Sequence, residues 1–346
     1  MINGIDAGNI FSGLGLLVSA ALVSGALIVL LRPALQRYAL ARPNARSSHT
    51  IPTPQGGGIA VIVATLGLAI IVVLAAGLFS PDDASRLWRV FAATALIAIV
   101  GAIDDIRTIA IAPRLFLQTV AVAAVIAALP IDLQVAPFLP WWVERALLLL
   151  AGVWYVNLVN FMDGIDWMTV AEIVPVTGGL VLIGVLFGTL PVSAIVVALA
   201  LCGALLGFAP FNRPVAKLFL GDVGSLPIGL LLFWLLALTA GSGHFAATLI
   251  LPLYYLADTT LTLLRRMRNG ESFWMAHRSH FYQRATDRGF SVPQVIVRIF
   301  AVNIALVVLA TATVLMPGLA SAIAALIAAM ILVGWLLYVF ERGQGK

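Results

Sequence analysis

The stretch VERALLLLAGVWYVNLVNFMDGIDW, residues 143–167, joins an apolar run to a group of amides and carboxylates. Together with the residues before it, the apolar part approaches the roughly 20 residues that cross a bilayer. Asn157, Asn160, Asp163 and Asp166 follow at its end. Ionisable groups are costly near hydrocarbon and usually mark a functional site when they occur there. The stretch therefore predicts a membrane-spanning helix with a site at its end.

The rest of the chain repeats the apolar pattern. Of its 346 residues, 62% are hydrophobic and only 10% are charged. We expect about eleven membrane-spanning helices, or ten because several runs are short or adjoin, in one domain over 1–346. The expected spans are 10–31, 57–79, 88–103, 114–129, 141–160, 170–188, 191–209, 225–241, 245–264, 295–315 and 319–340. The sequence thus predicts an all-α, polytopic membrane helix bundle.

The basic residues predict the orientation of this bundle. With eleven spans, all but three of the 20 Lys and Arg residues fall in loops on one side, the exceptions being Arg86, Arg89 and Arg145. Because Lys and Arg collect in cytoplasmic loops, we expect the N-terminus outside and the C-terminus in the cytoplasm. The cytoplasmic loops are then about 32–56, 104–113, 161–169, 210–224 and 265–294. This distribution also explains the net charge of +5, so no nucleic-acid partner is expected.

Further polar clusters flank the other apolar runs. They are Asp104 and Asp105 in VGAIDDIRT, Asp222 in FLGDVGS, and His277, Arg278 and His280 in AHRSHFYQR. The orientation comes from Lys and Arg alone, yet every cluster falls on the expected cytoplasmic side. A transporter would instead carry polar groups at mid-membrane depth and interrupted helices. The one-sided clustering indicates a site at the membrane surface.

The residue types at these positions suggest phosphate chemistry. Asn157, Asn160 and Asp163 recur every three residues and share one helix face, and such oxygens suit Mg²⁺. His277, His280 and Arg284 would share a basic face, if helical, that suits a diphosphate. Carboxylates for a metal and cations for phosphate, beside a membrane, indicate phosphoryl transfer to or from a lipid.

Each cluster also has a structural interpretation. Asp104 and Asp105 are also suited to ending a span at the interface, and Asp222 to capping the helix that follows it. The three glycines of HTIPTPQGGG (49–58) allow either a close ligand or close helix packing. Asp258, about two turns before Arg265, is either a structural partner of a basic residue or part of the site. The sequence leaves these alternatives open.

Taken together, these motifs resemble the polyprenyl-phosphate N-acetylhexosamine-1-phosphate transferases, the glycosyltransferase 4 family. That family includes undecaprenyl-phosphate GlcNAc-1-phosphate transferase-like enzymes and is related to phospho-N-acetylmuramoyl-pentapeptide transferase. The resemblance covers roughly residues 30–290 with the motifs in the family's order, and NFMDGID together with GDVGS is its most specific part.

The resemblance implies a Mg²⁺-dependent phosphoglycosyl transferase, with Mn²⁺ as a substitute. It would transfer a sugar 1-phosphate from a UDP-sugar to undecaprenyl phosphate, releasing UMP and beginning a surface glycan such as O-antigen. It implies a multi-pass protein of the bacterial inner membrane, among membrane lipids, with its site facing the cytoplasm. A homodimer is left open, and a flippase or a metal-dependent lipid phosphatase is the alternative function.

The resemblance also implies roles for individual residues. The metal would be at Asp222 with Asn160, and Asp104, Asp105 and Asp163 would be the catalytic carboxylates. The substrate-binding residues would be His49, Asn157, Asp166, His277, Arg278 and His280. Where many members of the family have Gly, this chain has Trp167, and Arg107 occupies a position that is often basic. These features leave the identity of the sugar open, as well as whether the acidic pair acts as base, nucleophile or positioner.

Overall fold

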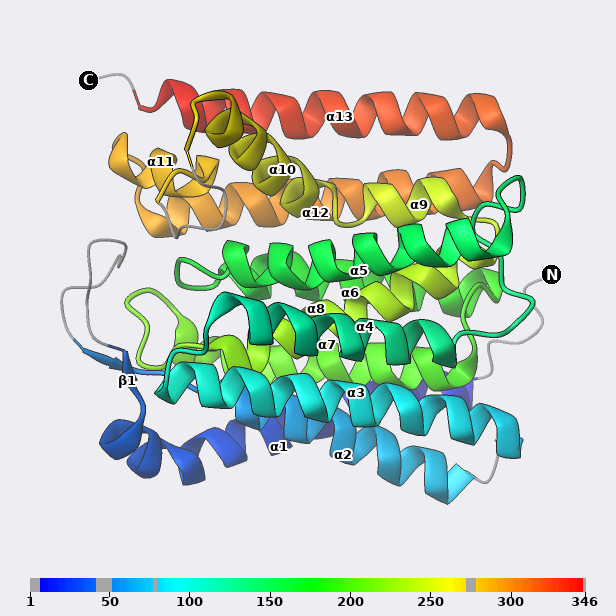
Figure 1. Ribbon diagram of the computed structural model, residues 1–346, viewed down its shortest axis with the longest axis horizontal. Helices are drawn as coiled ribbons and strands as arrows, with labels where there is room; N and C mark the ends of the chain where they lie inside the picture. The colour runs from blue at the N-terminus through cyan, green and yellow to red at the C-terminus, as the bar shows by residue number, and fades with distance from the viewer. Residues whose placement is uncertain (1–6, 42–51, 77–79, 272–277, 345–346) are drawn as a thin grey trace.

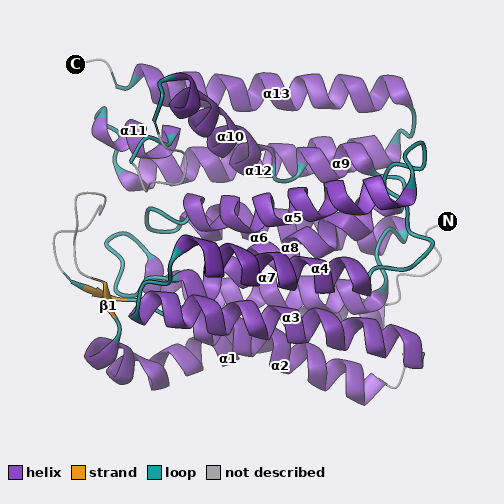
Figure 2. Ribbon diagram, viewed as in Figure 1, coloured by secondary structure: helices purple, strands orange, loops and turns teal. Residues whose placement is uncertain are grey.

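The computed structural model describes residues 7–41, 52–76, 80–271 and 278–344, and helices dominate these ranges (Figures 1 and 2). The helices are α1 (Ala7–Tyr38), α2 (Gly58–Ala76), α3 (Pro81–Ile106), α4 (Ile111–Ala128), α5 (Trp141–Met162), α6 (Met168–Phe187), α7 (Val192–Asn212), α8 (Asp222–Gly241), α9 (Phe245–Ile250), α10 (Leu253–Arg268), α11 (Phe281–Asp287), α12 (Val292–Leu315) and α13 (Leu319–Arg342). Two short antiparallel strands, β1 (Leu40–Ala41) and β2 (Thr53–Pro54), lie at one end of the bundle.

The predicted membrane bundle is confirmed. Within the described ranges, ten helices are long and apolar enough to cross a bilayer, namely α1 to α8, α12 and α13. They lie roughly side by side, as Figure 1 shows. Helices are favoured because each one satisfies its own backbone hydrogen bonds, which water cannot do inside a bilayer.

The ninth predicted span, 245–264, is not one continuous helix. It is divided into α9 and α10 at Leu251 and Pro252, because proline has no N–H to donate and clashes with the preceding turn. The preceding helix α8 ends with Gly241 against Leu133 of the α4–α5 loop, whereas Arg265 of α10 pairs with Glu341. The two short helices therefore connect opposite ends of the bundle, and Figure 1 shows α10 tilted away from α9.

Helix α8 forms the centre of the bundle. Its sequence, DVGSLPIGLLLFWLLALTAG, is apolar all round, and its residues Val223–Ala240 are all buried. A helix that is apolar on every face is stable only when other elements surround it. The helices that contact it include α3 and α5. This packing brings the ends of α3 and α5 to the start of α8, and the polar motifs occupy those three positions.

The chain enters and leaves the bundle at opposite ends. Helix α1 lies parallel to α7, with Gly13 near Leu199 and Gly207 near Ala21, so α1 ends where α7 ends. Helix α13 also ends there, because Glu341 pairs with Arg284 of α11, which lies at that end. This arrangement agrees with an odd number of membrane crossings, counting α9 and α10 as one.

Candidate functional site

The ends of α3 and α5 and the start of α8 enclose a cavity of ≈ 220 Å³. We call it the acidic cavity, because its lining includes the carboxylates of Asp105, Asp163, Asp166 and Asp222. No Lys, Arg or His among the described residues lines it. Four carboxylates around one cavity give it a negative potential, which would attract a cation.

Asp105 binds the start of α8. Its Oδ1 accepts a hydrogen bond from the backbone N–H of Asp222 at 2.9 Å, and its Oδ2 accepts one from Val223 at 3.1 Å. These are two of the amides at a helix N-terminus that have no partner within the helix. Both carboxylate oxygens are therefore engaged in holding α8, which favours positioning among the roles that the sequence left open.

Asp222 projects from the first turn of α8 toward α5 and α4. The Nδ2 of Asn160 donates to Asp222 Oδ1 at 2.8 Å and to Ser225 Oγ at 2.9 Å. The structure thus brings the two predicted metal ligands together. With the amide nitrogen used in this way, the amide oxygen of Asn160 is left as an acceptor for a cation.

Asp104 lies beside Asp222 and shares an arginine with it. Its Oδ2 accepts from Arg114 at 2.9 Å, and its Oδ1 accepts from the backbone N–H of Ile109 at 2.5 Å. The same Arg114 nitrogen is 3.8 Å from Asp222 Oδ2. Arg114 therefore places one positive charge at the edge of the carboxylate cluster, where a phosphate group would also be attracted.

Asp163 follows the last residue of α5, outside the membrane-spanning helix. Burial raises the pKa of Asp163 from the ordinary 3.8 to about 6. The hydrogen bond from Thr169 Oγ1 at 2.5 Å lowers this pKa, while the charges of Asp105 and Asp166 raise it. The folded protein holds this proton more tightly than the unfolded chain does. The free energy of unfolding therefore falls as the pH rises from the unfolded pKa of 3.8 to the folded pKa of about 6.

Replacing Thr169 with Val is expected to move the acid limb of the activity profile to higher pH. In the wild type this hydrogen bond stabilises the ionised form of Asp163 by about 1.5–3 kcal/mol. Its loss raises the pKa of Asp163, so a smaller fraction is ionised at pH 6 and kcat/KM should fall about tenfold at that pH. The measurement is kcat/KM against pH. Thr177→Val is the matched control, since the Thr177 hydroxyl donates to backbone carbonyls of its own helix and does not line the acidic cavity. Profiles that coincide would remove Asp163 from the titrating step.

Trp167 has a structural explanation. Its φ of 63° is left-handed, a conformation that Gly adopts readily and other residues adopt at a cost. The backbone N–H of Trp167 donates to Asn212 Oδ1 at 2.7 Å, and its indole N–H donates to the Ala209 carbonyl at 2.6 Å. These bonds to the end of α7 offset the strain. Trp167 is not among the residues that line the acidic cavity.

Of the other predicted substrate-binding residues, one lines the acidic cavity and the rest do not or lie outside the described residues. Asp166 lines the cavity and accepts from the backbone N–H of Ala216 at 2.9 Å. Asn157 lies one turn deeper in α5 and bonds to Gln118 of α4 at 2.7 Å, and it does not line the cavity. His49 and His277 lie outside the described residues.

The basic face expected for residues 277, 280 and 284 required a helix through all three, and residues 278–280 are not helical. Helix α11 begins only at Phe281, and His280 precedes it as the N-cap. Arg284 pairs with Glu341 of α13 at 2.7 Å, and Arg278 pairs with Asp287 at 2.9 Å. These two arginines therefore join parts of the protein to one another.

Asp258 organises the same loop from α10. It is 0% exposed, and its Oδ1 lies 3.0 Å from His280 Nδ1. It also accepts from the backbone N–H groups of Phe281 and Tyr282, at 3.1 and 3.3 Å. The structure thus supports the interpretation of Asp258 as a partner of a basic residue, and this residue is His280 rather than Arg265. His280 is 2% exposed, so its ring holds the loop in place.

This loop contacts the acidic site through Tyr282. Its hydroxyl donates to the Phe161 carbonyl at 3.3 Å, and burial raises the pKa of Tyr282 well above 10, which keeps the hydroxyl protonated. Gly164, which lines the cavity, lies so close that an added Cβ would be 2.1 Å from the Tyr282 oxygen. The loop of α11 and the DGID turn are therefore packed against each other.

Gly164→Ala is expected to push the α11 loop and the DGID turn apart. It should lower kcat at least about tenfold, since a misplacement of about 1 Å in an active site can lower the rate about a hundredfold. Turnover of the purified variant measures this. Gly178→Ala on α6 is the matched control, because an added Cβ at Gly178 would meet nothing within 4 Å. Normal turnover in Gly164→Ala would show that the contact does not position the site.

The glycines after Pro54 serve close packing. The backbone N–H groups of Gly57 and Gly58 donate to the carbonyls of Phe219 and Leu220, at 2.9 and 2.8 Å. A Cβ on Gly58 would be 2.2 Å from the Cα of Gly224 on α8. The structure thus supports the packing alternative for this part of the PTPQGGG motif, and the segment covers the start of α8.

Four residues of the site were not singled out from the sequence, and Arg114, which bonds to Asp104, is one of them. Gln55 lines the cavity and donates from Nε2 to the Asp105 carbonyl at 2.6 Å, and Ser225 and Thr169 bond to Asn160 and Asp163. Ser225 could have been found, because it lies three residues after Asp222 on the same helix face. The partners of Gln55 and Thr169 depend on tertiary packing.

Comparisons with known proteins agree with this arrangement. Residues 87–240, which contain most of α3, all of α5 and all but the last residue of α8, match the family model of glycosyl transferase family 4. A probable undecaprenyl-phosphate N-acetylglucosaminyl 1-phosphate transferase of Bacillus subtilis is 26% identical over 86% of each chain. Decaprenyl-phosphate N-acetylglucosaminephosphotransferases of Mycolicibacterium smegmatis and Mycobacterium leprae are 29% and 28% identical, over 77% and 76% of this chain and 73% of theirs.

Proposed function

We propose that the chain, whose residues 87–240 match the family model of glycosyl transferase family 4, transfers a sugar 1-phosphate from a UDP-sugar to undecaprenyl phosphate. An oxygen of the lipid phosphate attacks the β-phosphorus of the UDP-sugar, and the bond from that phosphorus to UMP breaks. The products are undecaprenyl-diphosphate-sugar and UMP. The observation that carries the proposal is the acidic cavity, formed where three membrane helices end.

The donor set of this cavity fits Mg²⁺. Asp222 and the amide oxygen of Asn160 would hold the ion, since hard oxygen donors suit it. In the described part of the chain, no three His, Cys, Asp or Glu side chains lie together as a metal site. The remaining positions would therefore go to substrate phosphates and water, which is how Mg²⁺ is commonly bound. When bound, it supplies charge neutralisation at the diphosphate.

The other carboxylates support the reaction in different ways. Both oxygens of Asp104 and both oxygens of Asp105 accept hydrogen bonds, so we assign these residues to positioning. Asp163 lines the cavity with one oxygen that has no hydrogen-bond partner among the described residues, which suits it to hold a proton. A phosphate monoester is largely dianionic near pH 7, so the nucleophile needs little help from a base.

We place the cavity on the cytoplasmic side of a bacterial inner membrane. The support is the excess of Lys and Arg in the loops at this end of the bundle. Arg114 and Arg284 are two of these residues, and the Arg284–Glu341 pair marks the end at which α11 and α13 lie. Arg278 is 27% exposed in the loop that packs on Gly164, and we assign it to the diphosphate of the donor. His49, Asn157, Asp166 and His277 remain assigned to substrate binding, and His280 to positioning this loop.

The broken α9–α10 segment is one feature that a transporter would share. The acidic cluster at one end of the bundle and the family match favour the transferase instead. The test is incubation of membranes with undecaprenyl phosphate and a panel of UDP-sugars labelled in the sugar. We expect label in the lipid extract together with stoichiometric UMP. Water-soluble products without labelled lipid would indicate a phosphatase, and UDP-sugars that all stay unchanged would contradict the transferase.

A further inference from the structure

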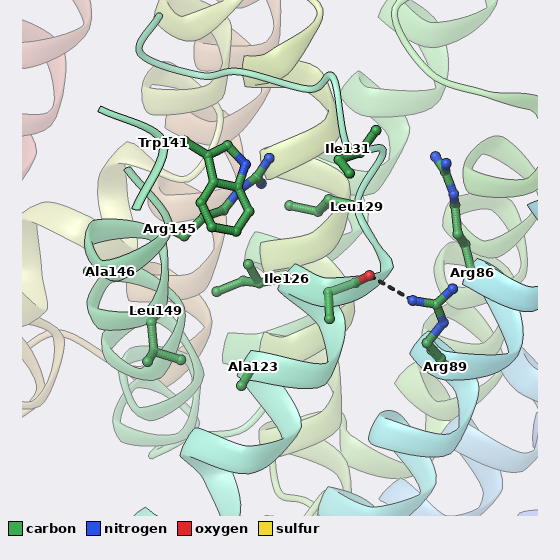
Figure 3. Close-up of a pocket in the computed structure, with 11 residues that line it drawn as sticks. Arg86, Arg89, Ala123, Ile126, Leu129, Ile131, Trp141, Arg145, Ala146 and Leu149 are labelled. Atoms are coloured by element: carbon green, nitrogen blue, oxygen red, sulfur yellow. Dashed lines mark hydrogen bonds between the residues drawn. The ribbon is translucent and has the colours of Figure 1, made fainter. Parts of the chain in front are cut away.

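The three arginines that fall outside the basic loops gather in one pocket. Arg86 and Arg89, from the start of α3, and Arg145, from the start of α5, line a cavity of ≈ 630 Å³ around the end of α4 (Figure 3). We call it the arginine pocket. Figure 3 shows Arg86 and Arg89 on one side, Trp141 and Arg145 on the other, and apolar side chains between them.

The arginine pocket lies at the opposite face of the membrane from the acidic cavity. Arg86 and Asp104 belong to the same straight helix and are 18 residues apart, a rise of about 27 Å. This distance is close to the roughly 30 Å thickness of bilayer hydrocarbon. The pocket is therefore a separate site at the other interface.

The three arginines have no charged partner within ion-pair distance among the described residues, and the guanidinium of Arg145 lies over the Trp141 ring at 5.5 Å. Arg89 donates to the Ala127 carbonyl at 2.8 Å and to Ser85 Oγ, and Arg145 donates to the Leu133 carbonyl at 2.7 Å. These acceptors are all neutral, and no described residue forms an ion pair with any of the three arginines. Arg145 Nη1 is buried without a hydrogen-bond partner. A guanidinium has five N–H donors, so several remain to bind an anion.

The rest of the pocket is apolar and faces lipid. Ile126, Leu129 and Leu149 line it, and Trp141 lies at its edge, as Trp does at membrane interfaces. On the outer face of α5, Leu147 is 50% and Leu150 69% exposed, which places lipid beside the opening. A ligand that fits has a phosphate for the arginines and a hydrocarbon chain for the apolar part.

We propose that the arginine pocket binds an anionic phospholipid, with the phosphate contacting Arg86 and Arg145 and an acyl chain running along Ile126 and Leu149. Arginine suits phosphate because its planar fork donates two parallel hydrogen bonds. Basic pockets between membrane helices bind anionic headgroups for this reason. The site is independent of the transferase reaction.

The test is native mass spectrometry of the delipidated full-length protein, titrated with dioleoyl-phosphatidylglycerol or dioleoyl-phosphatidylcholine. The two lipids have the same chains and differ in net charge. We expect the anionic lipid to bind at least about tenfold more tightly. The variant Arg86→Gln, which removes a side chain without hydrogen bonds to described residues, should weaken its binding about fivefold, and Arg86→Gln with Arg145→Gln about 25-fold.

Arg298→Gln is the matched control, because it removes one partly exposed arginine from α12 at the other end of the bundle and should leave binding unchanged. Glycerol 3-phosphate, tested alone, separates a lipid from a soluble phosphate. Equal binding of the two lipids, unchanged binding in both pocket variants, or glycerol 3-phosphate binding as tightly as the lipid would each overturn the proposal. Arg89 would then serve only to hold the end of α4, and Arg145 only to hold the α4–α5 loop.

Discussion

Replacing Asp222 with Asn is expected to lower kcat at least about a hundredfold while the protein folds normally. The amide oxygen can still accept from Asn160 Nδ2, so the local packing is kept. The substitution removes a negative charge from the proposed metal position. Substitutions of metal ligands commonly lower activity by about a hundredfold or more. Removing one of several like charges relieves repulsion, so Tm should stay equal or rise.

Two measurements on purified protein test this prediction. The first is turnover at saturating Mg²⁺. The second is the dependence of Tm on Mg²⁺, which should be present in the wild type and lost in Asp222→Asn. Asp132→Asn, in an exposed loop at the other end, is the control and should behave as the wild type. Near-normal turnover with a retained Mg²⁺ effect would exclude Asp222 from the site.

Replacing Asp105 with Asn should lower both activity and stability. Asp105 accepts hydrogen bonds from two backbone amides, but Asn has one oxygen and would direct its NH₂ at the other amide. One buried donor at the start of α8 then loses its partner, at a cost of about 1–3 kcal/mol. The lost charge also weakens the interaction with the helix dipole. Because Asp222 is the first residue of α8, kcat should fall at least about tenfold.

Thermal unfolding in detergent and turnover, measured on the same preparation, check this prediction. Asp105→Asn should lower Tm by several degrees, and Asp222→Asn should not. This contrast separates the residue that positions α8 from the residue that acts in the cavity. If Asp105→Asn lost activity with an unchanged Tm, its carboxylate would have a direct catalytic role.

Much of the site was predictable because the chain places its polar motifs at the ends of apolar runs. Asp104, Asn160, Asp163 and Asp222 come together because α3, α5 and the wholly apolar α8 pack side by side. The roles of Asp104 and Asp105 were not predictable, since their hydrogen-bond partners come from other segments. Pro252 was a visible signal for the break in the ninth span, but the length of the apolar run outweighed it.

The conformation of the basic loop before α11 could not be predicted from residue spacing alone. A spacing of three and four residues predicts a shared face only if the segment is helical, and α11 begins after His280. The buried Asp258 decides the conformation of this loop from another helix. Similarly, Arg86 and Arg145 are 59 residues apart, and only the packing of α3, α4 and α5 places them in one pocket.

The most direct test of the transferase account is isotope exchange between UMP and the UDP-sugar. The reaction exchanges one phosphoanhydride for another, so its equilibrium constant should lie within about tenfold of one, and the site must also serve the reverse direction. Purified enzyme with Mg²⁺, undecaprenyl phosphate and the matched UDP-sugar should therefore move label from UMP into UDP-sugar. Asp222→Asn should show almost no exchange. Release of UMP by the folded wild-type protein without any exchange would contradict the account.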